Sequence, residues 1–585
     1  MISSRPKSMR EMLQAYCAPR AREPVRSSPL LAFFYPVRLG RVAVRIAVVL
    51  VCLGLISPTF SAEPDAAAVD QIFSAYHESG SPGCSLGVIR NGTFVYRHGY
   101  GQGSLELAVP LTSESVFYMG SVAKQFTATS ILIAARRGLL SLDDDVHKYI
   151  PELPDYGHPI TLRQMLHHTS GFRDVLELLE LSGRNAADVH SFPELLDLVT
   201  RQKGLNFTPG DHYLYSNTNY FLLAEVVHRA SKEPMAKFAQ ENIFQPLHMA
   251  HTRFYDDHTV VVPGRVAAYA PSPRGDFLVD WSTNYDQIGG GGLMSSVDDL
   301  LHWDQNFYDD KLAEGSVVKE LQARGHLNSG QEIDYALGLQ ISDYRGLPTV
   351  EHSGSLFGYS ADLLRFPQQR FTVICLCNLE TANPVLLARK VADLYLAGEF
   401  RKPAPSNKHS WKQLSDPAQF AGTYENDVHN VVTFTTSGGK LALDGPTPRL
   451  LDSTSPFHFT IGETLIEFDT KSSKGVTSVK IYRGADVELT GARVELAHPD
   501  DAELSAYSGS YHSEELDTDL TLSVDNGRLL LRQKWHDPLT LKALAKDEFQ
   551  VAGPVMVFRR DSSNKVTGFV IFGDRARGMQ FERSQ

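Results

Sequence analysis

A serine and a lysine one helical turn apart are the first residues in this chain whose types and spacing could support catalysis. Ser121-Val-Ala-Lys124 follows Met119-Gly120 and opens a stretch with helical periodicity. At positions i and i+3 of a helix the two side chains lie on the same side, within reach of each other. A serine hydroxyl is a weak nucleophile until a base takes its proton, and a lysine whose pKa is lowered by burial can be that base. The pair therefore predicts a nucleophile, Ser121, and a general base, Lys124.

The S-x-x-K spacing alone is a weak signal because both residue types are common. The same spacing recurs in the chain, for example from Ser4, Ser437 and Ser562. The last two fall in expected turns between strands, where no helix would align the pair. The structural alternative for Ser121 is an ordinary helix N-cap. Only further motifs can distinguish the two interpretations.

A second motif, Tyr215-Ser-Asn217, lies just before an amphipathic helix. Its outer side chains are two residues apart and can point into one cleft. A phenol can share a proton relay with Lys124, and an amide can hold both Lys124 and a substrate carbonyl. A core aromatic is the structural alternative for Tyr215, and the same Y-x-N pattern recurs at Tyr424.

The third motif, His352-Ser353-Gly354, is the only H-x-G in the chain and leads into a strand. Gly354 would allow a substrate backbone to approach the strand edge. The alternative for His352 is a purely structural strand residue. The adjacent His167 and His168 point different ways on a helix, so they make no metal pair and are expected to be structural. No motif predicts a metal or another cofactor.

The elements around these motifs indicate an α/β or α+β domain with an antiparallel sheet and a helical insert. Asn91-Gly92 marks a hairpin between two strands. The periodicity and turn signals predict helices at 122–138, 161–167, 218–231 and 296–307, and strands at 84–90, 93–97, 360–366 and 371–377.

The first 62 residues differ in character from the rest. Residues 1–45 carry nine Lys or Arg against two acids, and an eleven-residue apolar run follows from Ile46 to Ile56. That run is shorter than the ~20 residues that a membrane-spanning helix needs. With small residues at Ser61 and Ala62, the segment predicts a secretory signal peptide with a long basic n-region, and hence a periplasmic or secreted protein. An uncleaved membrane anchor is the alternative.

Without residues 1–62 the chain holds 47 basic and 66 acidic residues, a net charge of −19. Such an acidic chain has no electrostatic basis for binding nucleic acid. Three cysteines remain, Cys84, Cys375 and Cys377. Their odd, small number indicates no disulfide framework, and their spacing fits no metal site. Cys375 and Cys377 are expected simply to pack in a strand.

The chain after the first domain contains a duplication. Residues 401–413 are polar, contain two prolines and predict a linker between a catalytic domain at 63–400 and two β-rich repeats, 414–498 and 499–585. Gly422-Thr-Tyr matches Gly509-Ser-Tyr, and Phe468 matches Phe558. Short alternating strands with turn signals predict that each repeat is a small antiparallel β-barrel, lipocalin-like in type.

The S-x-x-K, Y-x-N and H-x-G motifs, in this order, resemble those of the penicillin-recognising serine hydrolases. These include class C β-lactamases, D-alanyl-D-alanine carboxypeptidases, related esterases and D-aminopeptidases. Segments 166–171, 243–249 and 289–294 are also similar to the family. The resemblance covers roughly residues 67–400. A β-lactamase-like domain followed by two barrels is similar in architecture to the D-stereospecific aminopeptidases.

The resemblance implies a two-step acyl-enzyme mechanism. Ser121 would attack, Lys124 and Tyr215 would move protons, and Asn217 would orient Lys124 and the substrate. The oxyanion and substrate edge would be formed by Ser121 together with Ser353, Gly354 and Ser355, with the backbone N–H groups of Ser121 and Ser355 as donors. His352 stands where β-lactamases commonly carry a lysine, which disfavours efficient β-lactam hydrolysis because a neutral imidazole attracts a carboxylate less strongly.

One feature departs from the aminopeptidases. In that family a long loop of the last barrel reaches over the active site, whereas the corresponding stretch here is only 550–554.

From the motifs and the resemblance together we expect a serine hydrolase acting on amides or esters, above all on D-amino-acid amides or short peptides. Esterase, D-alanyl-D-alanine carboxypeptidase or β-lactamase activity is the alternative, and a non-catalytic binding protein a further one. The expected partner is a small substrate, with membrane contact only through the signal peptide and no prediction of oligomeric state.

Overall fold

The computed structural model describes residues 65–76, 80–185, 188–280, 286–312, 317–401, 416–445, 448–461, 464–470, 475–483, 486–534 and 536–584. The expected signal peptide, and the expected linker apart from Arg401, lie outside these residues. Within them no helix is both long enough and apolar enough to cross a membrane.

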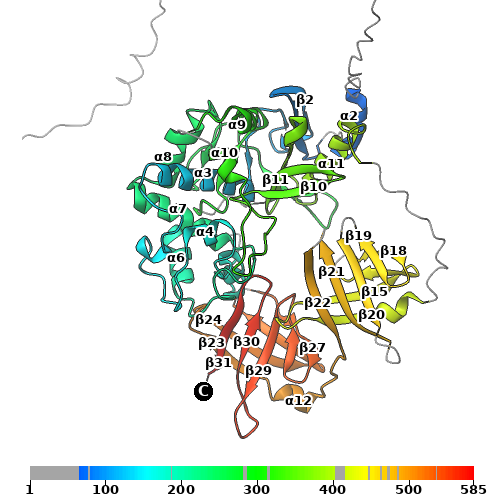
Figure 1. Cartoon of the computed structure of the whole chain (residues 1–585). Coiled ribbons are helices and arrows are strands. Elements are labelled where there is room, and N and C mark those ends of the chain that lie inside the picture. The colour runs from blue at the N-terminus through cyan, green and yellow to red at the C-terminus, as the bar shows by residue number, and fades with distance from the viewer. Residues whose placement is uncertain are drawn as a thin grey trace, which may run out of the picture. The chain divides into compact units, whose positions relative to one another are not determined.

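The first domain is built on a six-stranded antiparallel sheet with the strand order β10-β11-β12-β13-β1-β2 (Figure 1). Asn91 and Gly92 both have positive φ and join β1 to β2, as the hairpin signal predicts. The strands are β1 Cys84–Arg90, β2 Thr93–Tyr100, β10 Gln340–Tyr344, β11 Leu347–Leu356, β12 Tyr359–Phe366 and β13 Phe371–Cys377.

Helices cover both faces of this sheet. Helix α11 packs on β12, β13 and α2, and α9 packs on β1 and β13. The long buried helices α3 and α7 pack on each other and bring the first two sequence motifs together. The helices are α2 Ala66–Ile72, α3 Ala123–Arg136, α4 Leu162–Leu166, α5 Val175–Leu181, α6 Phe192–Thr200, α7 Asn217–Ser231, α8 Met235–Ala239, α9 Val297–Asp309, α10 Val317–Leu321 and α11 Pro384–Tyr395.

Short strands and turns complete the domain. The strand β9 pairs with both β5 and β6, β3 pairs with β4, and β7 pairs with β8. Their bounds are β3 Gln102–Ser104, β4 Val109–Pro110, β5 Phe117–Tyr118, β6 Arg253–Phe254, β7 Ala268–Pro271, β8 Phe277–Asp280 and β9 Leu293–Ser295. The turns of 3-10 type that matter below are η3 Gly120–Val122, directly before α3, and η7 Pro417–Phe420, directly before the first barrel.

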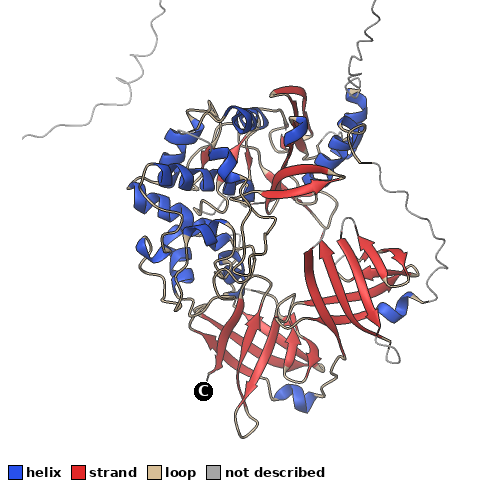
Figure 2. Cartoon of the chain, viewed as in Figure 1, coloured by secondary structure: helices blue, strands red, loops and turns tan. Residues whose placement is uncertain are grey.

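Each C-terminal repeat is a nine-stranded antiparallel sheet that nearly closes into a barrel, shown as almost purely strand in Figure 2. The first is ordered β17-β16-β15-β14-β22-β21-β20-β19-β18 and the second β26-β25-β24-β23-β31-β30-β29-β28-β27. The first comprises β14 Gly422–Glu425, β15 Val431–Ser437, β16 Lys440–Leu443, β17 Arg449–Leu450, β18 Asp452–Ser455, β19 His458–Ile461, β20 Thr464–Thr470, β21 Val476–Arg483 and β22 Asp486–Val494. The second comprises β23 Gly509–Ser513, β24 Thr518–Asp525, β25 Arg528–Gln533, β26 Leu539–Thr540, β27 Lys542–Ala545, β28 Glu548–Gln550, β29 Val555–Arg560, β30 Val566–Phe572 and β31 Arg577–Arg583, preceded by α12 Asp501–Ser505.

The two barrels repeat not only their strand order but also an internal hydrogen bond. Tyr424 Oη donates to the carbonyl of Phe420, and Tyr511 Oη donates to the carbonyl of Tyr507, at 3.0 and 2.7 Å. Both tyrosines are fully buried, so each hydroxyl needs such a partner. The expected fold class, a β-lactamase-like domain followed by two antiparallel barrels, is confirmed.

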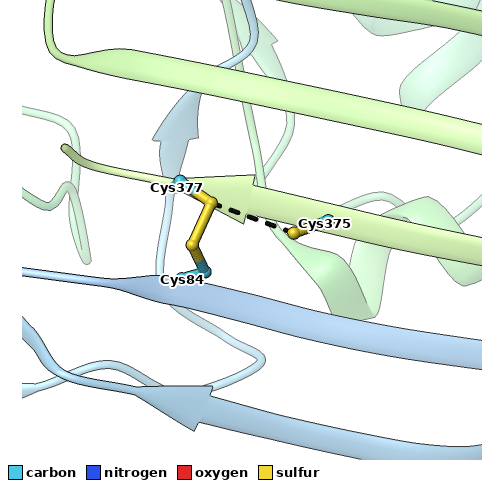
Figure 3. A group of neighbouring side chains, drawn as sticks. All are labelled: Cys84, Cys375 and Cys377. Carbon is cyan, nitrogen blue, oxygen red and sulfur yellow. Dashed lines mark hydrogen bonds between the residues drawn. A yellow bond between two sulfur atoms is a disulfide. The ribbon is translucent and has the colours of Figure 1, made fainter. Parts of the chain in front are cut away.

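The cysteines differ from expectation. Cys84 and Cys377 lie directly opposite each other on β1 and β13 and form a disulfide, drawn in Figure 3. The expectation of no disulfide, with Cys377 merely packing, is wrong. Cys375 does remain a buried thiol, with its Sγ 3.8 Å from that of Cys377. The pair is 293 residues apart in sequence, so a count of cysteines could not reveal that the first and last strands of the domain are neighbours in the sheet.

Candidate active site

Ser121 and Lys124 lie where the chain turns from η3 into α3. The Nζ atom of Lys124 is 3.0 Å from Ser121 Oγ. Gly120, immediately before the serine, has φ +51°, and a Cβ there would lie 2.5 Å from Ser355 N. A glycine is therefore required at this position, both for the left-handed backbone and for the close approach of β11.

The Lys124 side chain is completely buried. Its Nζ also donates to Asn217 Oδ1 at 2.8 Å and to the carbonyl of Gly290 at 2.7 Å. Burial lowers the pKa of Lys124 well below its usual value; the carboxylate of Asp174 opposes this and the guanidinium of Arg575 adds to it. Since the amide and the carbonyl oxygen can only accept, they take the two hydrogens of a neutral amine. Its lone pair is then left for the Ser121 hydroxyl, the arrangement that a general base needs.

Tyr215 borders the same pair. Lys124 Nζ lies 4.7 Å from the centroid of the tyrosine ring. Burial raises the pKa of Tyr215 far above its usual value, and a hydrogen bond with Ser121 partly offsets this. The phenol is thus protonated at neutral pH and can donate a hydrogen bond. The ring of the buried His168 lies 4.2 Å from that of Tyr215, and His168 Nδ1 accepts from Ser216 N, so this histidine supports the motif from behind.

Asn217, the first residue of α7, is oriented by a carboxylate that the sequence motifs did not identify. Its backbone N and its Nδ2 donate to Asp174 Oδ2 at 2.6 and 2.9 Å. The other oxygen of Asp174 accepts the N–H groups of Leu176 and Glu177 and so caps α5. With both Nδ2 and the backbone fixed, Asn217 Oδ1 faces Lys124. Asp174 before a helical stretch is recognisable as an N-cap, but nothing local indicates that it also holds Asn217.

Strand β11 brings the third motif against η3. A Cβ on Gly354 would lie 2.2 Å from the Met119 carbonyl oxygen and 2.7 Å from Ser121 N. Ser355 follows and lines the pocket at Ser121. The N–H groups of Ser121 and Ser355 belong to the two segments that meet here. Ser353 is exposed, and neither it nor Gly354 is among the residues that line the pocket.

His352 lies behind the pocket rather than in its lining. Its Nδ1 donates to the Ser353 carbonyl at 2.6 Å, so its Nε2 accepts from the Tyr335 hydroxyl at 3.0 Å. Burial, and secondarily Lys124, lower the pKa of His352 to about 3, so the ring is neutral. Its centroid is 6.2 Å from that of Tyr215. The histidine thus packs beside the tyrosine through a hydrogen-bonded neutral ring.

A pocket of about 180 Å³ opens onto Ser121. Of the residues predicted from sequence, Ser121, Tyr215, Asn217 and Ser355 line it. It is also lined by residues that sequence reasoning missed, including Gln287, Leu176 and Arg575. Arg575 comes from the turn between β30 and β31 of the second barrel. The barrel segment that approaches the site is therefore a different turn from the stretch 550–554.

Two groups of side chains among the described residues come close enough to share an ion. Cys84 and Cys377 of the first group are joined in the disulfide. In the second, His429 Nδ1 lies 2.6 Å from a carboxylate oxygen of Glu425 and 2.8 Å from one of Glu548. None of these residues lines the Ser121 pocket.

Comparison with known proteins adds to this geometry. Residues 69–397 match the model of the family described as Beta-lactamase. Penicillin-binding protein 4* of Bacillus subtilis (strain 168) is 32% identical over 376 residues, which cover 60% of this chain and 81% of that protein. The D-aminopeptidase of Brucella anthropi is 25% identical over 529 residues, covering 86% of this chain and 96% of that protein.

Among solved structures, the octameric penicillin-binding protein homologue from Pyrococcus abyssi is similar with a TM-score of 0.53 at 19% identity. The match covers 81% of this chain and 100% of that chain. At this level of identity the likeness concerns the fold.

Proposed function

The chain belongs to the beta-lactamase family, and from this premise we propose that it is a serine hydrolase that cleaves amides or short peptides of D-amino acids through an acyl-enzyme. The observation that carries the proposal is the buried Lys124, whose Nζ lies 3.0 Å from Ser121 Oγ and whose other two contacts are pure acceptors. The D-aminopeptidase of Brucella anthropi, which matches across 86% of this chain, supports the substrate class.

The first half-reaction transfers the acyl group to Ser121. Oγ attacks the carbonyl carbon while its proton passes to the neutral Lys124 amine. The N–H groups of Ser121 and Ser355 stabilise the negative oxygen of the tetrahedral intermediate; losing one such donor typically costs about 10²–10³ in rate. The proton then reaches the leaving amine through the Tyr215 hydroxyl. Collapse of the intermediate breaks the C–N bond and leaves an ester on Ser121.

The second half-reaction hydrolyses the acyl-enzyme and regenerates the free enzyme. A water molecule gives its proton to Lys124 and attacks the ester through a second tetrahedral intermediate held by the same two N–H groups. The Ser121 oxygen leaves and takes a proton back from Lys124. Asn217 keeps the lysine in place throughout, because Asp174 fixes the amide from the other side.

The alternatives share this machinery. Esters need less assistance for the leaving group, and a D-alanyl-D-alanine carboxypeptidase or β-lactamase would form the same acyl-enzyme. A non-catalytic binding protein would have no physical need for a neutral lysine against a serine hydroxyl, and for that reason we favour an enzyme.

The test is a substrate panel on protein lacking residues 1–62. It compares D-alanine p-nitroanilide, its L form, a D-Ala-D-Ala peptide, p-nitrophenyl butyrate and nitrocefin. We expect D-specific amide or peptide hydrolysis, abolished in Ser121→Ala, and a fall in turnover for Lys124→Ala at least as steep as for Tyr215→Phe. Full activity of Ser121→Ala would show that another residue is the nucleophile. Failure of a fluorophosphonate to modify Ser121 in folded protein would favour a binding protein.

We also propose that the protein is exported, with residues 1–62 as a cleaved signal peptide. The Cys84–Cys377 disulfide supports this, because structural disulfides are usual in oxidising compartments and rare in the cytosol. Fractionation of the producing cells followed by N-terminal sequencing is the test. A mature chain beginning near residue 63 outside the cytoplasm is the expected result, and an intact N-terminus in the membrane fraction would instead indicate an anchor.

A further inference from the structure

The turn that connects β30 to β31 is fixed to the catalytic domain through its backbone. The carbonyl of Arg575 accepts from Asp174 N at 3.0 Å and from Asn206 Nδ2 at 2.8 Å. The backbone N–H groups of Asp574 and Arg575 donate to the two oxygens of Glu177 at 2.8 and 2.6 Å. The position of residue 575 beside the pocket is thus set by main-chain contacts that do not depend on its side chain.

The side chain of Arg575 is, by contrast, little used by the protein. Its guanidinium makes two long ion pairs, 3.8 Å to Asp174 and 4.0 Å to Asp574, and no hydrogen bond to any described residue. It is 35% exposed and lines the pocket that contains Ser121. A guanidinium offers five N–H donors in a planar fork that matches a carboxylate. Those donors are available to a molecule in the pocket.

Asp174 accepts no hydrogen bond from the Arg575 guanidinium, which lies 3.8 Å away. Its two oxygens already accept four N–H groups, from the backbone of Leu176 and Glu177 and from Asn217 N and Nδ2. It is also completely buried, whereas Arg575 borders the pocket. The positive charge of Arg575 interacts with the negative charge of Asp174 only at long range. The N–H donors of the guanidinium therefore remain available to the pocket that Arg575 lines.

Arg575 carries the only charged side chain among the described residues that line the pocket. The neighbouring lining residues Tyr118, Gln287 and Asn217 are polar and uncharged. Lys124 is not among the lining residues, and its burial disfavours the charged form of the amine. The pocket therefore attracts a negative group and offers no carboxylate to a free ammonium group.

We propose that Arg575 is a specificity-determining residue that binds a carboxylate of the substrate next to the scissile bond. The inference rests on the proposed function and narrows it: among D-amino-acid amides and peptides, the site selects those that carry a free carboxylate over their uncharged counterparts. The second barrel thereby supplies part of the substrate site of the first domain.

The test uses two substrates that differ only in charge, Nα-acetyl-D-Ala-D-Ala and its C-terminal carboxamide. The measured quantity is the ratio of kcat/KM for the carboxylate to that for the carboxamide, in the wild type, Arg575→Gln and Arg575→Lys. Arg532→Gln, an exposed arginine of the same barrel, is the matched control. We expect the ratio to fall about 10- to 100-fold in Arg575→Gln, the effect of one charge-assisted hydrogen-bonded pair, to fall less in Arg575→Lys and not to change in Arg532→Gln.

A second measurement on the wild type does not depend on any variant folding. Nα-acetyl-D-alanine and its carboxamide are compared as protectants of Ser121 against a fluorophosphonate. We expect the carboxylate to protect at lower concentration. Equal protection, or a ratio of kcat/KM that Arg575→Gln leaves unchanged, would overturn the role of Arg575 while Ser121 labelling and turnover still upheld the hydrolase. Absence of labelling and turnover altogether would instead refute the proposed function itself.

Discussion

Lys124 shows how much of a catalytic group's chemistry depends on its surroundings at the scale of one residue. An exposed lysine is protonated at neutral pH and cannot take a proton from serine. Here burial is the main cause of a lowered pKa, Asp174 works against it, and Arg575 reinforces it. The sequence places the amine near the hydroxyl, but the tertiary structure buries it, and two residues far away in the chain modulate its pKa.

This balance predicts the pH dependence of an Arg575 variant. Removing the positive charge in Arg575→Gln lets the pKa of Lys124 rise, so a smaller fraction of the lysine is neutral at a given pH. We expect the acidic limb of kcat/KM for the uncharged p-nitrophenyl butyrate to move to higher pH, with Arg575→Lys close to the wild type. The acidic limb of kcat/KM reports the pKa of the essential base in the free enzyme. A limb that stays in place in Arg575→Gln would contradict the electrostatic coupling.

Glu177 gives a second prediction at this scale. Burial raises its pKa to about 7, although two N–H donors of the barrel turn favour the charged form. A carboxyl group with a raised pKa contributes stability below its unfolded value of about 4.5, and this contribution is lost as the pH rises through 7. The shift corresponds to about 3 kcal/mol. We expect the unfolding free energy of the wild type, relative to that of Glu177→Gln, to decline from pH 4.5 to 7 in urea titrations. A constant difference would contradict the raised pKa.

At the scale of elements, the site depends on strand β11 meeting the N-terminus of the nucleophile helix. Gly354 and Gly120 face each other across this contact, and each would place a Cβ within 2.5 Å of the opposing backbone. The close approach brings Ser121 N and Ser355 toward one point. Neither element would form an oxyanion site alone.

The prediction at this scale is that Gly354→Ala separates the two elements. A methyl group 2.2 Å from the Met119 carbonyl oxygen must push β11 away. We expect kcat/KM to fall by about 10² or more, the typical cost of one lost oxyanion donor, with the rate of Ser121 acylation as the measurement. Gly398→Ala is the control, since a Cβ there meets no atom within 4 Å. An unchanged rate of Ser121 acylation in Gly354→Ala would show that the reaction does not depend on the close approach of β11.

At the scale of the whole molecule, the second barrel belongs to the same packed body as the catalytic domain. Buried residues of both, such as Leu178 and Tyr511, fall in one continuous hydrophobic cluster, while the first barrel has a separate core around Phe434 and Phe468. The buried pair Arg173–Glu515, with Nη1 2.6 Å from Oε1, joins the two parts.

We expect that breaking this ion pair greatly lowers the free energy of unfolding. Both side chains are at most 5% exposed, so Glu515→Gln leaves Arg173 as a buried, unpaired charge, at a cost of about 3–5 kcal/mol. The neighbouring Glu514 pairs with Lys203 at the surface, where both side chains are exposed, so Glu514→Gln should change stability little because water screens the pair. Urea unfolding measures both. A double variant, Arg173→Met with Glu515→Gln, should recover much of the loss, and equal effects of the two glutamine variants would contradict a buried interface.

Part of this molecule was predictable because it depends on residues close together in sequence. Helical spacing relates Ser121 to Lys124, and a turn dipeptide joins β1 to β2. The two barrels were visible because duplicated sequence preserves the positions of core residues such as Tyr424 and Tyr511, which the structure shows in equivalent hydrogen bonds.

The sequence by itself thus determined the fold class, the order of the motifs and the candidates for nucleophile and base. Only the tertiary structure decided what surrounds them: the Cys84–Cys377 disulfide, the hydrogen bond from Asn217 to Asp174, and the position of Arg575 in the lining of the pocket. Each of these joins segments separated by tens to hundreds of residues. Local patterns record which side a residue faces within its own helix or strand, whereas the neighbours that set its charge and partners are chosen by the packing of whole elements and domains.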